Sequence, residues 1–355
     1  MAKSGILHIG LPKTATTSCQ EALFSNRESL LKRHGLFYPS LTVSHNSILV
    51  VMFMEDPRSH VTVKSRGITT LDGAERLRRR YREKMEADIA GTPWDTLVLS
   101  SEGLSNLPVE SLTKLQDWLH RFTTDWTVML WSRHPVSYTT SNVQQLIKGG
   151  DTLERLLSAA PLPNIKRRAS NAFEVFGQEN LRLSAFEEAR DEAGGAVAAF
   201  CRRLGLPEDT AMEIATSTTT RNESMSMLAT LLLSSLNRQR PRFVDGRMNP
   251  ERRHKEVRIF QQIKGERFRL PPEAEADIRR RSRADVRWMN ETFGTRHYLD
   301  VLADAEGAPE GAGSPYSPEM LDSMSLLLSD LINKQETRLD QVRHKLEAWW
   351  KKEAI

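Results

Sequence analysis

The sequence predicts an α/β fold, a parallel sheet flanked by helices, with a helical C-terminal extension. Short apolar segments with the length and composition of buried strands occur at residues 6–9, 97–101, 128–131 and 181–184. Helical patterns separate each segment from the next, and this alternation is typical of parallel sheets. The 355 residues are 39% hydrophobic and 27% charged, which is the composition of an ordinary globular protein.

Helical patterns fill the spaces between the predicted strands. Residues 14–35 follow the first strand and are expected to form a helix that ends at Gly35. The short apolar segment 36–39 is expected to add a small strand. Beyond Glu187 the pattern becomes mostly helical. The other predicted helices cover residues 72–91, 107–122 and 135–148.

Residues 303–318 are rich in glycine, alanine, proline and acid, which is the composition of a linker. We therefore expect an α/β domain over 1–300 that is helical from about residue 190, a linker over 301–318 and an amphipathic helix over 319–355. The apolar residues of that helix recur at close to seven residues per two turns. It is expected either to pack on its own domain or to form a homodimer through a coiled coil.

A lysine and several threonines lie where the first strand meets its helix. The start of a helix leaves backbone N–H groups unpaired and carries a partial positive charge, so such a turn binds phosphate or sulfate readily. In the nucleotide-triphosphate loop G-x-x-x-x-G-K-[ST], Gly10 and Thr17 would match, but Ala15 and Thr16 replace the glycine and the lysine. Lys13 comes three residues early. These departures weaken the interpretation as an ATP-Mg kinase.

The form Pro-Lys-Thr-x-Thr-Thr at residues 12–17 resembles the loop of sulfotransferases that use 3′-phosphoadenosine 5′-phosphosulfate (PAPS). The resemblance implies a P-loop-type sheet and a loop that wraps the 5′-phosphosulfate. By the same resemblance, Lys13 neutralises the bridging oxygen that leaves. The family usually has glycine at the position of Ala15, so a positive φ there would cost about 1 kcal/mol. The donor-binding residues implied are Lys13, Thr14, Ala15, Thr16, Thr17 and Ser18.

A second motif lies at the end of the third long strand. Arg133 follows the strand and Ser141 lies eight residues later on the next helix, which resembles the 3′-phosphate site of the same family. A guanidinium group binds phosphate bidentately, and a serine hydroxyl can add a further hydrogen bond. Arg221 and Asn222 are similar to a stretch in bacterial carbohydrate-type members, and either close over the nucleotide or belong to a helix cap. The resemblance covers roughly residues 5–240. It implies PAPS as co-substrate, adenosine 3′,5′-bisphosphate as product and a hydroxyl of a carbohydrate or glycoconjugate as acceptor.

Transfer to a hydroxyl group needs a residue that takes the acceptor's proton, and two residues qualify. Glu102 follows a predicted strand, so it is expected at the carboxyl edge of the sheet beside the loop. His45 has a pKa suited to neutral pH, and members of the family often carry their base some tens of residues after the loop. Because a sulfuryl group carries less negative charge than a phosphoryl group, Lys13 and the helix start are expected to act without a metal ion.

The charge distribution indicates what the protein binds. The formal net charge is +4, and between residues 238 and 296 there are 17 Lys or Arg against 9 Asp or Glu. This excess is expected either as a solvated helical face or as a surface that attracts an anionic glycan. Aromatic residues are not regularly interleaved with it, so nucleic acid is not an expected partner.

Two cysteines and no long apolar segment favour a cytoplasmic protein without a transmembrane helix. Two other classes of function stay open. One is a nucleoside or sugar kinase that uses ATP-Mg, and the other is a non-catalytic nucleotide-binding scaffold. Both would use the same loop, so the sequence does not separate them from a sulfotransferase by the loop alone.

Overall fold

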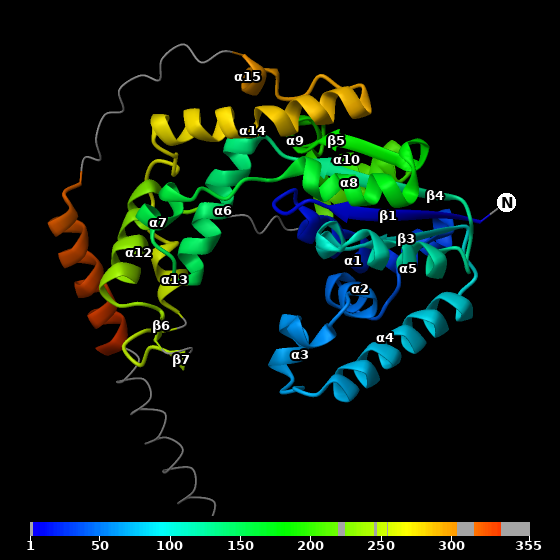
Figure 1. Cartoon of the computed structure of the whole chain (residues 1–355), viewed down its shortest axis with the longest axis horizontal. Helices are drawn as coiled ribbons and strands as arrows, with labels where there is room; N and C mark the ends of the chain where they lie inside the picture. Colours follow the sequence, from blue (N-terminus) through cyan, green and yellow to red (C-terminus); the bar gives the residue numbers. More distant parts are fainter. Residues whose placement is uncertain (1–2, 219–223, 245–246, 254, 304–315, 335–355) are drawn as a thin grey trace, which may run out of the picture. The chain divides into compact units, whose positions relative to one another are not determined.

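The computed structural model describes residues 3–218, 224–244, 247–253, 255–303 and 316–334. The chain divides into two compact units. The first comprises Met1–Pro135, Pro163–Arg221 and Arg281–Ala303, and the second comprises Val136–Leu162, Asn222–Arg280 and Asp304–Ile355. Each unit is therefore assembled from segments that are far apart in the sequence (Figure 1).

A five-stranded sheet forms the centre of the first unit. Its order is β2-β3-β1-β4-β5, and every neighbouring pair is parallel. β1 is central and pairs with β3 on one side and β4 on the other. The strands are β1 (Ser4–Gly10), β2 (Leu36–Phe37), β3 (Thr96–Ser100), β4 (Trp126–Ser132) and β5 (Leu181–Ala185). The predicted α/β fold with a parallel sheet is confirmed.

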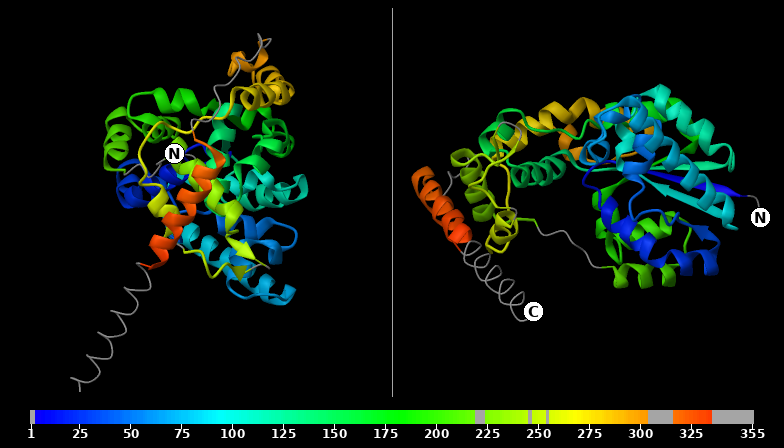
Figure 2. Two further views of the ribbon diagram at one scale, coloured as in Figure 1. Left: turned by 90° about the vertical axis from the view of Figure 1, so that its left-hand side faces the viewer. Right: turned by 90° about the horizontal axis from the view of Figure 1, so that it is seen from below.

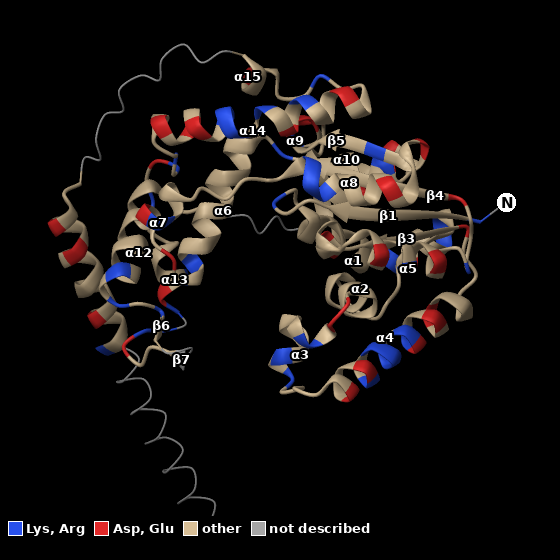
Figure 3. Cartoon of the chain, in the orientation of Figure 1, with Lys and Arg blue, Asp and Glu red and all other residues tan. Residues whose placement is uncertain are grey.

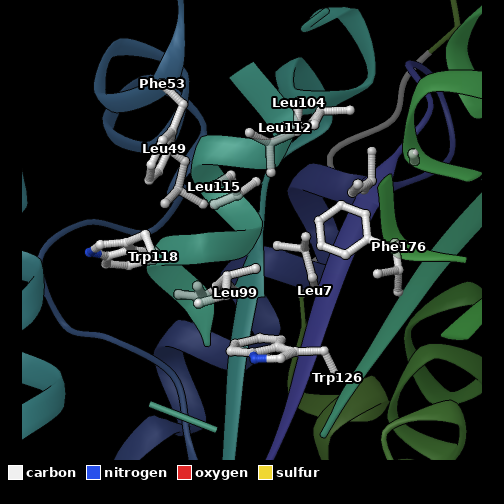
Figure 4. Close-up of a cluster of buried hydrophobic side chains, with 14 of the residues drawn as sticks. Leu7, Leu49, Phe53, Leu99, Leu104, Leu112, Leu115, Trp118, Trp126 and Phe176 are labelled. Atoms are coloured by element: carbon white, nitrogen blue, oxygen red, sulfur yellow. The ribbon is translucent and has the colours of Figure 1, made fainter. Parts of the chain in front are cut away.

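Both faces of the sheet are covered by helices, as the right-hand view in Figure 2 shows. On one face Leu7, Leu99 and Leu130 point into a large apolar cluster, part of which is drawn in Figure 4. Successive residues of a strand point to opposite faces of the sheet, and in these strands the residues on both faces are apolar. This is the pattern of an internal parallel strand, which is buried on both sides. The helices that pack here are α2 (Asn46–Phe53), α4 (Leu71–Gly91), α5 (Val109–Leu119) and α8 (Ile165–Phe176).

The opposite face carries the alternate set of strand residues. Val98, Met129 and Trp131 lie in a second apolar cluster together with Leu23 of the first helix. The helices on this face are α1 (Thr16–His34), α9 (Phe186–Asp191), α10 (Gly195–Arg203) and α11 (Glu208–Ser217). The helix α1 ends at Gly35, which has a φ of 62° and donates its N–H to the carbonyl oxygen of Leu31 at 3.0 Å. The predicted end of this helix is confirmed. Glycine suits this position because it adopts the left-handed conformation of the cap most easily.

Shorter elements link these helices and strands. They are η1 (Pro57–Ser59), α3 (Val61–Ser65), η2 (Glu102–Asn106), η3 (Gln178–Asn180) and α15 (Leu299–Leu302). The predicted helix over 72–91 is observed as α4, whose exposed side is rich in charged residues (Figure 3). Within the described residues, no helical segment combines the length and apolarity that a lipid bilayer would require.

The second unit has its own apolar core, which includes Ile147, Leu232, Leu233 and Phe260. Pro135 begins α6, as predicted. The elements of this unit are α6 (Pro135–Gly149), α7 (Leu153–Ser158), α12 (Met227–Gln239), β6 (Phe243–Val244), β7 (Arg247–Met248), α13 (Glu256–Phe260) and the first part of α14 (Pro272–Phe293).

The predicted C-terminal helix is partly described. Residues 318–334 are helical, and the hydroxyl of Ser317 accepts a hydrogen bond from the N–H of Met320 at 3.2 Å, which caps the helix start. Leu321 and Ile332 are buried in the core of the second unit. This part of the helix therefore packs on its own unit. Of the linker predicted over 301–318, residues 304–315 lie outside the described residues, as does the predicted helix beyond residue 334, and the homodimer stays a prediction.

Candidate active site

The turn that joins β1 to α1 has an unusual backbone. Lys13 (φ 70°) and Ala15 (φ 58°) both lie in the left-handed region, which L-residues avoid. Between them Thr14 is fully buried, and its Oγ1 donates a hydrogen bond of 2.6 Å to the carbonyl oxygen of Leu11. Each left-handed residue other than glycine costs about 1–2 kcal/mol, so the surrounding contacts must hold the turn in place. Ala15 therefore has the positive φ, and with it the backbone strain, whose cost the sequence analysis gave for an alanine at this position.

The start of α1 is suited to an anion. Ala15 is the N-cap and makes no side-chain hydrogen bond to the helix, and the described first turn carries no acidic residue. The positive end of the helix is therefore not offset locally. A Cβ atom at Gly10 would collide with Oγ1 of Thr16, so this close turn requires glycine. Thr16 and Ser18 are buried, whereas the Thr17 side chain is exposed.

Replacement of Ala15 by glycine is expected to stabilise the protein. The change relieves about 1–2 kcal/mol of backbone strain, while the greater conformational freedom of the unfolded chain costs about 0.4–1 kcal/mol, so the free energy of unfolding should rise by up to about 1.6 kcal/mol. Urea denaturation measures this difference. Ala87→Gly is the matched control, since Ala87 is exposed within α4 and its loss should cost about 1 kcal/mol. Equal destabilisation by the two variants would contradict the strain at Ala15.

Lys13 and Glu102 share one neighbourhood at the carboxyl ends of β1 and β3. Glu102 is the first residue of η2, two positions after β3 ends at Ser100. Burial raises the pKa of Glu102, while the positive charges of Lys13 and Arg168 act in the opposite direction. The carboxylate is therefore shielded from water in part and lies within electrostatic range of two cations. The arrangement puts a proton acceptor beside the loop lysine, at the edge where parallel sheets bind ligands.

Asn46, which the sequence analysis missed, fixes the turn that carries Glu102. Its Oδ1 accepts a hydrogen bond from Ser101 Oγ at 2.9 Å and another from the N–H of Gly103 at 2.6 Å. The two bonds fall on either side of Glu102. A Cβ atom at Gly103 would lie 2.6 Å from the same Oδ1, so glycine is needed here. An asparagine in the first turn of a helix gives no local sign of a contact 57 residues away.

His45, the other predicted base, is fully buried. Its ring is stacked on Tyr38, with centroids 4.2 Å apart and planes at 27°. Nδ1 accepts a hydrogen bond from the N–H of Ser100 at 3.4 Å, so the ring proton is assigned to Nε2, which lies 3.1 Å from the carbonyl oxygen of Pro39. Burial lowers the pKa of His45 to about 4. Both ring nitrogens are engaged with the backbone, and the residue joins the start of α2 to β3.

A second buried histidine lies beneath the loop. His8 Nδ1 is 2.9 Å from Ser100 Oγ, and Gln20 Nε2 donates to the hydroxyl and the carbonyl oxygen of Ser100 at 3.0 and 3.1 Å. These bonds connect β1, β3 and α1 directly behind the turn. Burial lowers the pKa of His8 to about 3. The network ties the helix start to the sheet and so supports the strained turn.

The two buried histidines predict that the protein loses stability in mild acid. Their folded-state pKa values of about 3 and about 4 lie below the ordinary 6.5, so the unfolded chain binds protons that the folded chain does not. Their effect is negligible above pH 7, grows as the pH falls below 6.5, and levels off only below the folded-state values. The free energy of unfolding should fall by about 2 kcal/mol between pH 7 and pH 5.5.

Urea denaturation at several pH values tests this. His120 is exposed, so His120→Gln should leave the slope unchanged. A flat profile between pH 7 and pH 5.5 would show that His8 and His45 take up protons in the folded state.

Arg133 connects the end of β4 with the loop. Its Nη1 donates a hydrogen bond of 2.5 Å to the carbonyl oxygen of Lys13, and its guanidinium lies 5.1 Å from the centroid of the Phe186 ring. The side chain is 18% exposed. Burial lowers the pKa of Arg133, while the carboxylate of Glu187 acts in the opposite direction. The two predicted anion-binding residues, Lys13 and Arg133, are therefore brought together in the first unit.

The remaining predicted residues are not brought to this site by the described contacts. Ser141 is half-buried on α6 and belongs to the second unit, whereas Arg133 belongs to the first. Arg221 and Asn222 lie outside the described residues. Their predicted part in donor binding stays a prediction.

No protein-family model matches the chain, and no curated protein is significantly similar to it. Among solved structures, the chain is similar to the crystal structure of a sulfotransferase from Alicyclobacillus acidocaldarius, with 13% sequence identity and a TM-score of 0.45. The similarity covers 85% of this chain and 100% of the other.

Proposed function

We propose that this protein is a sulfotransferase that moves a sulfuryl group from PAPS to a hydroxyl group of a carbohydrate or glycoconjugate. The observation that carries the proposal is the meeting of three groups at the ends of adjacent strands. The left-handed turn with Lys13 follows β1, Glu102 follows β3 and Arg133 follows β4. Lys13 links the other two groups: the charge of its side chain acts on Glu102, and its backbone carbonyl oxygen accepts a hydrogen bond from Arg133. Anion-binding groups and a proton acceptor thus share one edge of the sheet.

The described residues suit a nucleotide that carries one phosphate on the 5′ oxygen of its ribose and another on the 3′ oxygen. We assign the 5′ end to residues 13–18, where an uncapped helix start follows the strained turn. We assign the 3′-phosphate to Arg133, because a guanidinium group binds a phosphate dianion through two parallel hydrogen bonds. When bound, PAPS would supply the activated sulfuryl group. Ser141, Arg221 and Asn222 are further residues that the sequence resemblance assigns to this ligand.

Lys13 and Glu102 have complementary parts in this proposal. The ammonium group of Lys13 stabilises the negative charge that develops on the leaving oxygen. Glu102 takes the proton of the acceptor hydroxyl, and the burial that raises the pKa of Glu102 makes it a stronger base than an exposed carboxylate. We prefer Glu102 to His45 as the base, because both His45 nitrogens are engaged with backbone groups. Asn46 is a positioning residue, because it accepts hydrogen bonds from Ser101 and Gly103, the residues on either side of Glu102.

The acceptor class rests on the sequence resemblance and on charge. In the second unit, basic residues between 258 and 269 are exposed and have no acidic partner among the described side chains. A surface of this kind favours an anionic glycan over a neutral one. The residues concerned are Arg258, Lys264, Arg267 and Arg269.

Thermal-shift titration tests the donor. We expect adenosine 3′,5′-bisphosphate to raise the melting temperature in the presence of a chelator, because binding to the folded state alone stabilises it. Stabilisation only by ATP with Mg²⁺ would favour the kinase. Stabilisation by the bisphosphate without any turnover of radiolabelled PAPS over a panel of hydroxyl acceptors would favour the non-catalytic scaffold.

A further inference from the structure

Arg133 already faces a carboxylate. Glu187, the second residue of α9, has its Oε1 4.0 Å from Arg133 Nε. The two side chains are only 18% and 21% exposed, so water screens their interaction less than it would on the open surface. The residue proposed to bind phosphate therefore has a negative charge beside it, belonging to the protein itself.

The carboxylate of Glu187 is held in this position by two hydrogen-bond donors. The backbone N–H of His134 is 3.2 Å from each of its two oxygens. The hydroxyl of Tyr298 donates to Oε2 at 3.1 Å and also lies 3.1 Å from Ser132 Oγ. Tyr298 has a φ of 56°, which is a strained backbone at the start of α15. With both oxygens engaged, the Glu187 side chain cannot turn away without breaking hydrogen bonds.

Arg190 lies within electrostatic range of Glu187 and offsets its negative charge in part. Its positive charge acts on Arg133, which places it in the same neighbourhood. Its own Nε, however, is 2.7 Å from Asp191 Oδ1 in an exposed ion pair. Glu187 is an acidic side chain that lies within ion-pair distance of Arg133 and offsets part of its positive charge.

We infer that Glu187 is a specificity-determining residue that weakens the hold of Arg133 on a 3′-phosphate. This inference rests on the proposed function. A phosphate at Arg133 is attracted by the guanidinium and repelled by the carboxylate a few ångströms further away. Adenosine 3′,5′-bisphosphate is the product of the proposed reaction, and product release limits the turnover of many enzymes. Glu187 thus favours release of the product at the expense of affinity for the 3′-phosphate.

Calorimetric titration with two nucleotides tests the inference. Adenosine 3′,5′-bisphosphate carries the 3′-phosphate and adenosine 5′-monophosphate lacks it, so the ratio of their Kd values isolates the 3′ end. In Glu187→Gln, which keeps the shape of the side chain and removes its charge, the bisphosphate should bind about three- to tenfold more tightly. The monophosphate should change little. Because the readout is a ratio within one preparation, a partly inactive sample does not affect it.

Two variants serve as controls. Glu187→Asp keeps the charge and should keep the wild-type ratio. Glu188 is 63% exposed and pairs with His297 at 2.8 Å, so Glu188→Gln should also leave the ratio unchanged. An unchanged ratio in Glu187→Gln, or weaker binding of the bisphosphate, would overturn the inference and leave the proposed function standing. If the wild-type protein binds neither nucleotide, the proposed function fails and this inference fails with it.

Discussion

The Lys13→Ala variant is expected to turn over radiolabelled PAPS at least about 10²-fold more slowly than the wild-type protein. The substitution removes the ammonium group that stabilises the leaving oxygen. It leaves the carbonyl oxygen of residue 13 in place, and this oxygen is what Arg133 binds at 2.5 Å. Affinity for adenosine 3′,5′-bisphosphate should therefore fall much less than kcat. Steady-state kinetics with radiolabelled PAPS measure the change in kcat, and calorimetric titration measures the change in affinity for the bisphosphate.

Lys32→Ala is the matched control, because Lys32 is an exposed residue in the last turn of the same helix. It should keep wild-type kcat and nucleotide affinity. A Lys13→Ala protein that works at the wild-type rate would remove the loop lysine from the chemistry.

The Glu102→Gln variant is expected to lose about 10²- to 10⁴-fold in kcat while its Kd for adenosine 3′,5′-bisphosphate stays within a few fold. Glutamine keeps the size of the side chain but cannot take the acceptor's proton. The wild-type rate should decline in acid as Glu102 becomes protonated, and burial moves this decline above the pH expected for an exposed glutamate. The decline should be absent from the residual activity of the variant.

His45→Gln distinguishes the two predicted bases. The variant should be less stable than the wild-type protein, because it loses the stacking on Tyr38 and the hydrogen bonds of the His45 ring. Each folded molecule should keep most of its activity. A Glu102→Gln protein with nearly full kcat, beside a folded His45→Gln protein without activity, would reverse the assignment.

Much of the first unit could be predicted because its signals are local. Buried strands are apolar over several consecutive residues, and the observed β1 (Ser4–Gly10) and β4 (Trp126–Ser132) enclose the predicted segments 6–9 and 128–131. Gly35 predicts a helix end because the left-handed cap favours glycine. Strand order then brings the turn, Glu102 and Arg133 to one edge, since the ends of parallel strands lie together.

The contacts that orient the site could not be predicted from local patterns. Asn46 reaches Gly103 across 57 residues, and Glu187 reaches the N–H of His134 across 53. An isolated His45 would have the pKa of an ordinary base, and only the packed structure shows its burial. The division into two units was equally hidden, because each unit draws on three separate segments of the chain.

A crystal structure of the protein with adenosine 3′,5′-bisphosphate tests the central claim most directly. The account predicts the 5′-phosphate within about 3 Å of backbone N–H groups in residues 13–18, and the 3′-phosphate on the guanidinium of Arg133. A nucleotide bound elsewhere, or held by only one of these two groups, would contradict it.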